Sequence, residues 1–351
     1  MSGAGFTIRK GPLDYFSAAT MTCIDGSRKM CRASTEPGGP RRCSADMRSA
    51  YARASTVVEQ LQRSETALAC QSAPIAGSTS RRGGRRQALS PSRAADFKRC
   101  PLLYRLRAID RIPEIPPAVA VRGTVVHAAL EQLYKLPATE RTADTARSLI
   151  APAWQQVVAG QPELAEHFPD DRADQLIAES QKLIDRYYQL EDPRRFTPEA
   201  VEHRIEMQLE DGTPLRGFID RVDVAPTGEL RVVDYKTGKA PPEGPAESSA
   251  LFQMKFYAVA MWRGRGVVPT KLRLLFLGDG QVLDYSPDEP ELERFEKTLS
   301  ALWQGIQNAS QTGDFPPNPG RMCRFCNHQS RCPAFGGTPP PYPGRMPSAA
   351  S

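Results

Sequence analysis

Two short stretches, GFIDRVD at residues 217–223 and VDYKTG at residues 233–238, decide the fold of this 351-residue chain. Both are rich in apolar and β-branched residues, and a Pro-Thr-Gly turn signal lies between them, so the pattern predicts a β-hairpin. Side chains two positions apart project from one face of a strand, so Asp234 and Lys236 should point together. If the connecting loop has an odd length, Asp220 faces Asp234 or Lys236 across the hairpin, with Cβ atoms about 5 Å apart.

Acids placed inside apolar stretches are costly unless something compensates their charge. Two carboxylates side by side repel, and one shared divalent cation removes that cost. The hairpin therefore indicates a metal-dependent site able to cleave phosphodiesters. The alternative is a surface hairpin whose charges are solvated or paired with each other, and this interpretation suits Asp223, Glu229 and Arg231.

His127 lies in the segment 121–134, where apolar residues recur at helical spacing and His127 falls at the edge of the apolar stripe. From spacing alone, such a histidine is more often a hydrogen-bonded core residue than a metal ligand.

Gln253 and Tyr257 are one helical turn apart in the segment 251–262, so both can face the hairpin. Glu202, in the alternating run 201–209, is a weaker candidate for an outer-shell acid, and a solvated strand face explains it equally well.

Four of the eight cysteines have metal-ligand spacing: Cys100, then Cys323 and Cys326 as C-x-x-C, then Cys332. Disulfides are disfavoured because no secretory signal opens the chain, and we expect a cytoplasmic protein with reduced thiols. Spacing does not separate zinc from a 4Fe-4S cluster, since both accept four thiolates, and His328 could replace one cysteine on zinc. The other four have no partner pattern and stay unassigned: Cys23, Cys31, Cys43 and Cys70.

The ordered set of motifs resembles the PD-(D/E)XK nuclease superfamily and, more closely, its RecB-like exonucleases that carry an iron-sulfur cluster. The resemblance runs from about residue 89 to residue 335 and includes GTVVH at 123–127, Asp220, DYK at 234–236, and Gln253 with Tyr257. It implies a restriction-endonuclease-like fold and assigns the following roles. Mg²⁺ or Mn²⁺ is held by His127, Asp220, Asp234 and the main-chain carbonyl of Tyr235; Lys236 orients water; Gln253 and Tyr257 support Lys236 or contact phosphates; Cys100, Cys323, Cys326 and Cys332 hold a 4Fe-4S cluster.

The function so implied is a metal-dependent DNA exonuclease acting in repair or recombination. One alternative is a non-catalytic, iron-sulfur or zinc-stapled DNA-binding subunit of a helicase-nuclease complex, and another is a zinc-stapled structural protein. Any helicase is a separate polypeptide, because Gly238-Lys239 lacks the rest of a P-loop. Strand polarity, strand preference and exonuclease versus endonuclease action are not encoded in these motifs.

The net charge of +6 comes from the excess of basic residues at the beginning of the chain. Residues 1–86 hold 14 Arg and Lys against 6 Asp and Glu, which leaves 32 of the 46 bases and 34 of the 40 acids in the remainder. DNA affinity of the folded part must therefore come from local patches. The candidate bases are Arg99, Arg105, Arg107, Arg122, Lys236 and Lys239, with Arg321, Arg324 and Arg331 around the cysteines.

Three regions are expected. Residues 1–87 have the composition of a disordered basic tail, either a nucleic-acid arm or an over-extended gene start. Residues 88–335 should form one α/β nuclease domain, a mixed central sheet flanked by helices with a C-terminal cysteine knuckle, and residues 336–351 a disordered Pro-rich tail. No apolar run approaches the roughly 18 residues of a membrane span. Helices are expected at 92–108, 123–134, 142–159, 171–191, 249–262 and 289–309, and strands at 200–209, 215–225, 229–235, 271–277 and 281–285.

Overall fold

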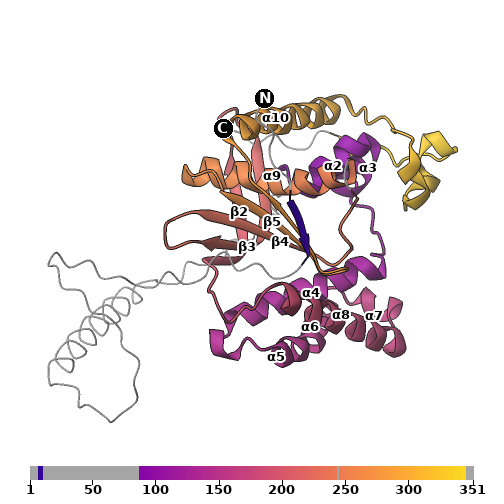
Figure 1. Ribbon diagram of the computed structural model, residues 1–351. Helices are drawn as coiled ribbons and strands as arrows, with labels where there is room; N and C mark the ends of the chain where they lie inside the picture. Colours follow the sequence, from indigo (N-terminus) through magenta and orange to yellow (C-terminus); the bar gives the residue numbers. More distant parts are fainter. Residues whose placement is uncertain (1–6, 11–86, 243–244, 345–351) are drawn as a thin grey trace, which may run out of the picture. The chain divides into compact units, whose positions relative to one another are not determined.

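The computed structural model describes residues 7–10, 87–242 and 245–344 (Figure 1). Within these residues, six strands form one mixed sheet in the spatial order β1-β6-β5-β4-β3-β2. Only β4 and β5 pair in parallel, and α9 makes the crossover between them. The strands are β1 (Thr7–Lys10), β2 (Ala200–Gln208), β3 (Pro214–Val224), β4 (Leu230–Lys236), β5 (Lys271–Phe276) and β6 (Gln281–Tyr285).

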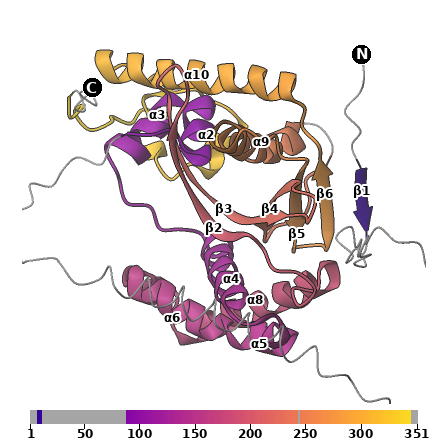
Figure 2. The ribbon, with the colours of Figure 1, turned by 90° about the vertical axis from the view of Figure 1, so that its left-hand side faces the viewer.

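Helices cover both faces of the sheet, with α9, α10 and α2 on one side and α4, α5, α6 and α8 on the other (Figure 2). The helices are α2 (Pro91–Arg99), α3 (Pro101–Tyr104), α4 (Ala118–Lys135), α5 (Ala143–Ser148), α6 (Ile150–Gly160), α7 (Glu163–His167), α8 (Asp170–Leu190), α9 (Pro245–Arg265) and α10 (Glu289–Thr312). Short helical turns are η1 (Arg105–Ile109), η2 (Ala138–Glu140), η3 (Arg321–Phe325), η4 (Gln329–Arg331) and η5 (Pro333–Phe335). The expected mixed α/β architecture is confirmed.

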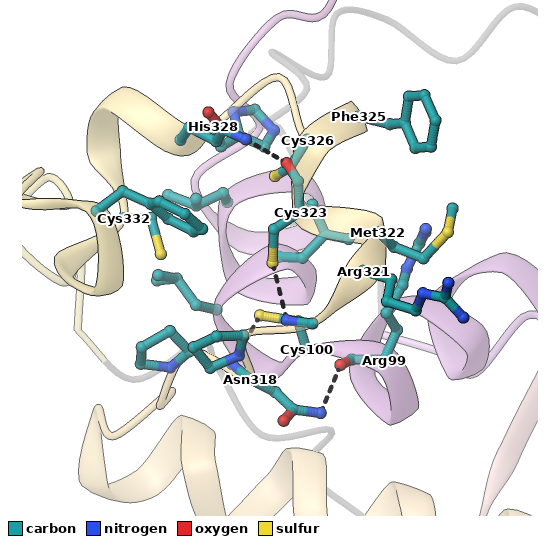
Figure 3. A pocket seen from close by; sticks show the side chains of 18 of the residues that line it. Arg99, Cys100, Asn318, Arg321, Met322, Cys323, Phe325, Cys326, His328 and Cys332 are labelled. Carbon is teal, nitrogen blue, oxygen red and sulfur yellow. Dashed lines mark hydrogen bonds between the residues drawn. The ribbon is translucent and has the colours of Figure 1, made fainter.

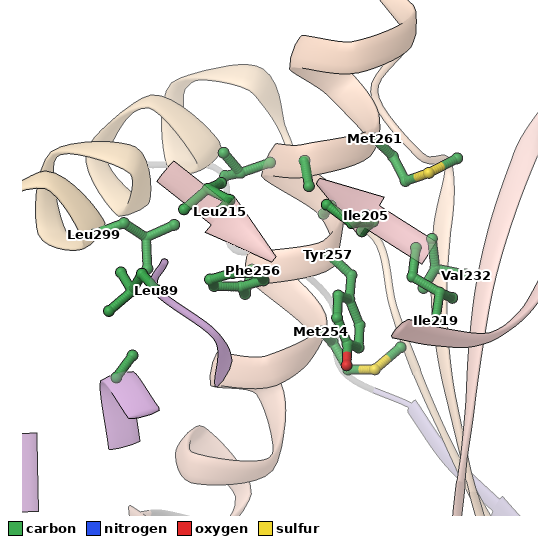
Figure 4. Packing of buried hydrophobic residues seen from close by; sticks show 14 of the residues in the cluster. Leu89, Ile205, Leu215, Ile219, Val232, Met254, Phe256, Tyr257, Met261 and Leu299 are labelled. Atoms are coloured by element: carbon green, nitrogen blue, oxygen red, sulfur yellow. The ribbon is translucent and has the colours of Figure 1, made fainter. Parts of the chain in front are cut away.

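Two hydrophobic cores hold these layers together, one on each face of the sheet. In the first core, Met254 and Phe256 of α9 lie in one cluster with Ile219 of β3 and Val232 of β4 (Figure 4). On the opposite face, Tyr235 belongs to the core formed with α4 and α8. Because successive residues of β4 alternate between the cores, Asp234 and Tyr235 contact different helical layers.

The helix expected at 92–108 is interrupted at Cys100, whose backbone is extended (φ −162°, ψ 111°). The residue before a proline is disfavoured in the helical conformation, and Pro101 follows Cys100. Helix α2 therefore ends at Arg99, and α3 continues into the π-helical turn η1. The interruption leaves Cys100 between two helices.

Two parts of the expected tails are ordered. Thr7–Lys10 form β1, which pairs antiparallel with β6. Without β1, the outer edge of β6 would have unpaired backbone donors and acceptors, and β1 satisfies them. The rest of the predicted basic tail up to residue 86, with its four cysteines, lies outside the described residues.

At the other end, the expectation of a loose segment from Gly336 is wrong for residues 336–344. Tyr342 packs against Phe315 with ring centroids 5.7 Å apart, and its hydroxyl donates to the carbonyl of Ser310 at 2.8 Å. The Arg105 guanidinium lies 5.2 Å from the same ring. An aromatic contact, a hydrogen bond and a cation-π contact thus hold this segment against the end of α10, the residues that follow it and η1. Residues 345–351 lie outside the described part.

None of the described helices is both long enough and apolar enough to cross a membrane.

Candidate active site and cysteine pocket

The regular pairing of β3 with β4 ends at Arg221, and the opening between the two strands begins at Asp220. The paired residues run from Val224 opposite Leu230 to Arg221 opposite Val233, so the next step of the register sets Asp220 opposite Asp234. At that step the Asp220 carboxylate accepts the N–H of Tyr235 at 2.8 Å. A side chain thus takes the place of a backbone acceptor, and both carboxylates face the opening between the strands.

Asp234 is 1% exposed, and its two oxygens have different partners. Oδ1 accepts from the amide of Gln253 at 2.8 Å, while Oδ2 lies 2.7 Å from Nζ of Lys236. Lys236 also donates to the amide oxygen of Gln253 at 2.8 Å. Gln253 therefore joins the acid and the ammonium, which fixes which way its amide points.

Tyr257 lies one turn of α9 after Gln253, and the amide of Gln253 donates to its hydroxyl at 3.2 Å. A Cβ at Gly217 would approach the Tyr257 ring to 3.0 Å, so the glycine allows this close approach of α9 to β3. The structure thus brings Gln253 and Tyr257 to the hairpin, as their spacing suggested.

His127 reaches the same opening from α4, on the other side of the sheet. Its Nε2 lies 2.9 Å from the carbonyl oxygen of Tyr235, and its Nδ1 lies 3.4 Å from Asp220 Oδ2. Both ring nitrogens are therefore directed at atoms of the proposed metal site. Every residue that the sequence assigned to this site lies in one place.

Glu202 of β2 is closer to the site than the sequence indicated. Its neighbours Val201 and His203 pair with Arg221 and Ile219, which sets Glu202 opposite Asp220. One donor atom each from His127, Glu202 and Asp220 lie within 4.8 Å of one another. Glu202 has a positive φ of 49°, a conformation that is uncommon for a residue with a side chain and that often marks functional sites.

The site concentrates negative charge. Burial, together with the charge of Asp220, raises the pKa of Asp234 to about 6 and the pKa of Glu202 to about 7. Burial alone would lower the pKa of His127, but Asp220 and Asp234 raise it to about 9. A divalent cation would relieve this repulsion, and carboxylates, a carbonyl and an imidazole are ligands that suit Mg²⁺ or Mn²⁺. The residues present therefore fit such an ion.

A second candidate site is formed by cysteines from the start and the end of the domain. Cys100, Cys323, Cys326 and Cys332 are free thiols that line one cavity of about 270 Å³ (Figure 3). The backbone N–H of Asn318 donates to Cys100 Sγ at 3.4 Å, and the N–H of Gly320 donates to Cys323 Sγ at 3.3 Å. Donors of this kind stabilise thiolates that bind a metal centre.

His328, between Cys326 and Cys332, is 2% exposed and lines the same cavity. Its Nε2 lies 2.5 Å from Glu114 Oε1. Glu114 also accepts two hydrogen bonds from Arg107, at 2.6 and 2.8 Å, and these bonds with the nearby His328 lower its pKa to about 2 against the effect of burial. A polar chain thus ties the cysteine knuckle to the segment that follows η1.

A mixed sheet that brings two aspartates and a lysine to an opening between its strands is suited to metal-dependent cleavage of phosphodiesters. Comparison with known families agrees, because residues 88–333 match the PD-(D/E)XK nuclease superfamily. The chain belongs to this superfamily, whose nucleases use divalent metal ions.

Two curated relatives come from bacteriophages. The chain is 28% identical over 276 residues to the Gene 69 protein of Mycobacterium phage D29, covering 70% of this chain and 96% of the phage protein. It is 26% identical over 286 residues to the Gene 69 protein of Mycobacterium phage L5, with the same two coverages. These names carry no information on activity.

Proposed function

We propose that this protein is a Mg²⁺- or Mn²⁺-dependent DNA exonuclease of the RecB-like, iron-sulfur-bearing branch of its superfamily, acting in repair or recombination. One observation carries the proposal. His127, Asp220, Asp234 and Lys236, which come from three separate elements, meet where the β3–β4 ladder opens.

His127, Asp220, Asp234 and the carbonyl of Tyr235 would hold the ion, with Glu202 as a further carboxylate. A divalent ion so bound supplies Lewis-acid polarisation of a phosphate and lowers the pKa of water. Membership of the superfamily and the charge of the donor set support this assignment.

Lys236 acts on the reacting phosphate and its attacking water. Asp234 and Gln253 hold its ammonium by two contacts of 2.7 and 2.8 Å, so little side-chain reorganisation is needed when substrate arrives. The ammonium orients the water and stabilises the charge that builds on the phosphoryl oxygens. Tyr257 positions Gln253 and thereby acts on Lys236 through it.

The four cysteines would hold a 4Fe-4S cluster. Backbone N–H groups donate to Cys100 Sγ and Cys323 Sγ, as expected for thiolates that bind a metal centre. The choice of a cluster over a single zinc ion, which also accepts four thiolates, rests on the resemblance to the iron-sulfur-bearing RecB-like nucleases.

The proposal is tested with anaerobically purified protein, metal analysis, and digestion of end-labelled linear DNA and closed circular DNA. Linear strands should shorten in Mg²⁺ or Mn²⁺ while circles survive, and a chelator should stop the reaction. Cutting of circles would replace exonuclease with endonuclease action. No cleavage of either substrate would favour the non-catalytic DNA-binding subunit, for which a separate helicase is the expected partner.

The Asp234→Ala variant should lose cleavage by a factor of about 10³ or more and keep its fold, because it removes an ion ligand and the partner of Lys236. Glu229→Ala, an exposed acid at the turn of the same hairpin, is the matched control and should cleave normally. Wild-type digestion by Asp234→Ala would show that the site is wrongly assigned.

A further inference from the structure

We propose that the outer face of η3, formed by Met322 and Phe325 beside Arg321 and Arg324, is a stacking platform for single-stranded DNA. The inference rests on the proposed nuclease function, because it names the form of DNA that the protein holds on a surface outside the candidate active site. It adds a docking surface on the cysteine knuckle.

The geometry of η3 separates its side chains into rows. A 3₁₀ helix has three residues per turn, so side chains at i and i+3 lie one above the other. Met322 and Phe325 therefore form one row, and Arg321 and Arg324 form the next. The third row begins with Cys323, which lines the cavity with the other cysteines, and Arg321, Met322 and Phe325 lie at the exposed rim of the same cavity.

The two outer rows are open to solvent. The side chains of Met322 and Phe325 are 51% and 65% exposed, and Figure 3 shows them with Arg321 pointing away from the sulfur atoms. The guanidinium of Arg324 lies 4.7 Å from the centre of the Phe325 ring. An exposed aromatic ring stacked with an arginine offers both a π-face and a positive charge.

The charge distribution identifies the occupant as nucleic acid. No aspartate or glutamate follows Asp314, whereas Arg321, Arg324 and Arg331 lie in the knuckle. Residues 87–351 as a whole hold 34 acids against 32 bases, so this basic surface stands out from a domain without net positive charge. Phosphates would contact the arginines, and an apolar protein partner would leave these charges uncompensated.

The row of Met322 and Phe325 favours single-stranded DNA over a duplex. Every unpaired base exposes a π-face that can stack on Phe325, whereas a duplex keeps these faces inside its own stack. Such stacking tolerates any sequence, as an exonuclease requires. Met322, in the same row, extends the apolar surface beside the ring.

Fluorescence anisotropy tests the platform with holo protein carrying Asp234→Ala, in chelator, and a labelled oligothymidylate of about 20 nucleotides. Phe325→Ala should weaken binding about tenfold, and Phe325→Trp should bind as tightly as the parent, because base stacking on an aromatic ring is lost only in the first. A blunt duplex of the same length should bind to Phe325→Ala and to the parent protein with equal affinity. Iron content and visible absorbance verify that each variant keeps its cluster.

Two further variants complete the design. Arg321→Gln combined with Arg324→Gln should reduce the slope of log affinity against log salt by about 1.4, since each phosphate contact on a single strand contributes about 0.7. Val267→Ala removes an apolar side chain that is 45% exposed before β5, at the end of the sheet away from Lys236, and should change nothing.

Unchanged affinity in Phe325→Ala, or equal weakening for duplex and single strand, would overturn the platform. Because no cleavage is measured, this outcome is separate from a failure of the proposed nuclease activity.

Discussion

Gln253 is the residue on which the geometry of the candidate site depends most directly. One amide contacts the Asp234 carboxylate, the Lys236 ammonium and the Tyr257 hydroxyl within 3.2 Å. Since the amide has one oxygen and one nitrogen, only one orientation satisfies the acid and the ammonium together. A glutamate at this position would place a negative charge against Asp234.

Glu202→Gln should raise the Mn²⁺ concentration needed for half-maximal cleavage by about tenfold, while cleavage at saturating Mn²⁺ falls far less. The carboxylate lies in the donor set with His127 and Asp220, but Asp220 and Asp234 remain as ligands. Cleavage titrated with Mn²⁺ measures the effect.

Glu206→Gln, an exposed acid on the same strand, serves as the control and should titrate like the wild type. An unchanged Mn²⁺ requirement in Glu202→Gln would place Glu202 outside the ion's coordination.

For single residues, the sequence predicted the site positions that depend on local strand or helix periodicity. Strand alternation placed Asp234 with Lys236, and one helical turn placed Gln253 with Tyr257. The position of Glu202 could not be found in that way, because it depends on the register between β2 and β3 and on one residue with positive φ.

At the scale of the elements, the β3–β4 hairpin carries different groups on its two faces: the acids of the candidate active site on one and a buried ion network on the other. Next to Asp220, the fully buried Arg221 contacts Glu191 at 2.8 Å and Asp223 at 3.0 Å. Asp223 also pairs with Arg231 at 2.7 Å. Asp223 and Arg231 are paired with each other, as the alternative interpretation of the hairpin expected, but they lie buried within an ion network and not at the surface, whereas Glu229 is exposed.

Arg221→Ala should lower the free energy of unfolding by about 3–5 kcal/mol, because it leaves Glu191 and Asp223 buried with one fewer counter-charge. Urea denaturation followed by circular dichroism measures the change, and its midpoint should shift without a change of slope.

Arg216→Ala, at a less buried position of the same strand, provides the comparison and should cost under about 1 kcal/mol. Equal midpoints for the two variants would contradict the role given to the network.

The element boundaries were largely predictable because each strand and helix has its own periodicity and turn signals. The break at Cys100 follows from Pro101, although helical spacing alone predicted one continuous helix. The contact of Tyr342 with Phe315 could not be predicted, since it joins a segment without periodicity to the loop that follows α10.

Over the whole molecule, the cysteine cavity joins the first helices of the domain to its last segment. Cys100 lies between α2 and α3, and the other three cysteines follow α10. A cluster bound here would close a loop of more than 200 residues, and by analogy with a disulfide this closure contributes about 5 kcal/mol. We therefore expect the cluster to act on stability.

Cys100→Ser should lower the melting temperature of the holo protein by several degrees and make the knuckle sensitive to proteases, because the remaining three ligands no longer connect to α2. Differential scanning fluorimetry and limited proteolysis under anaerobic conditions measure both effects. After removal of iron, the wild type and the variant should have the same melting temperature. A difference between these two apo forms would assign the effect to the side chain itself.

The hydrogen bond from Tyr235 N–H to Asp220 gives one carboxylate two duties. Replacing Asp220 by alanine would strip a buried amide of its acceptor, so the variant would be weakened in its architecture as well as its chemistry. Loss of activity after that change would be ambiguous. To trap an uncut nucleic acid for crystallography, Asp234→Asn is the better choice, because it keeps an oxygen for Gln253 and leaves the backbone of the hairpin intact.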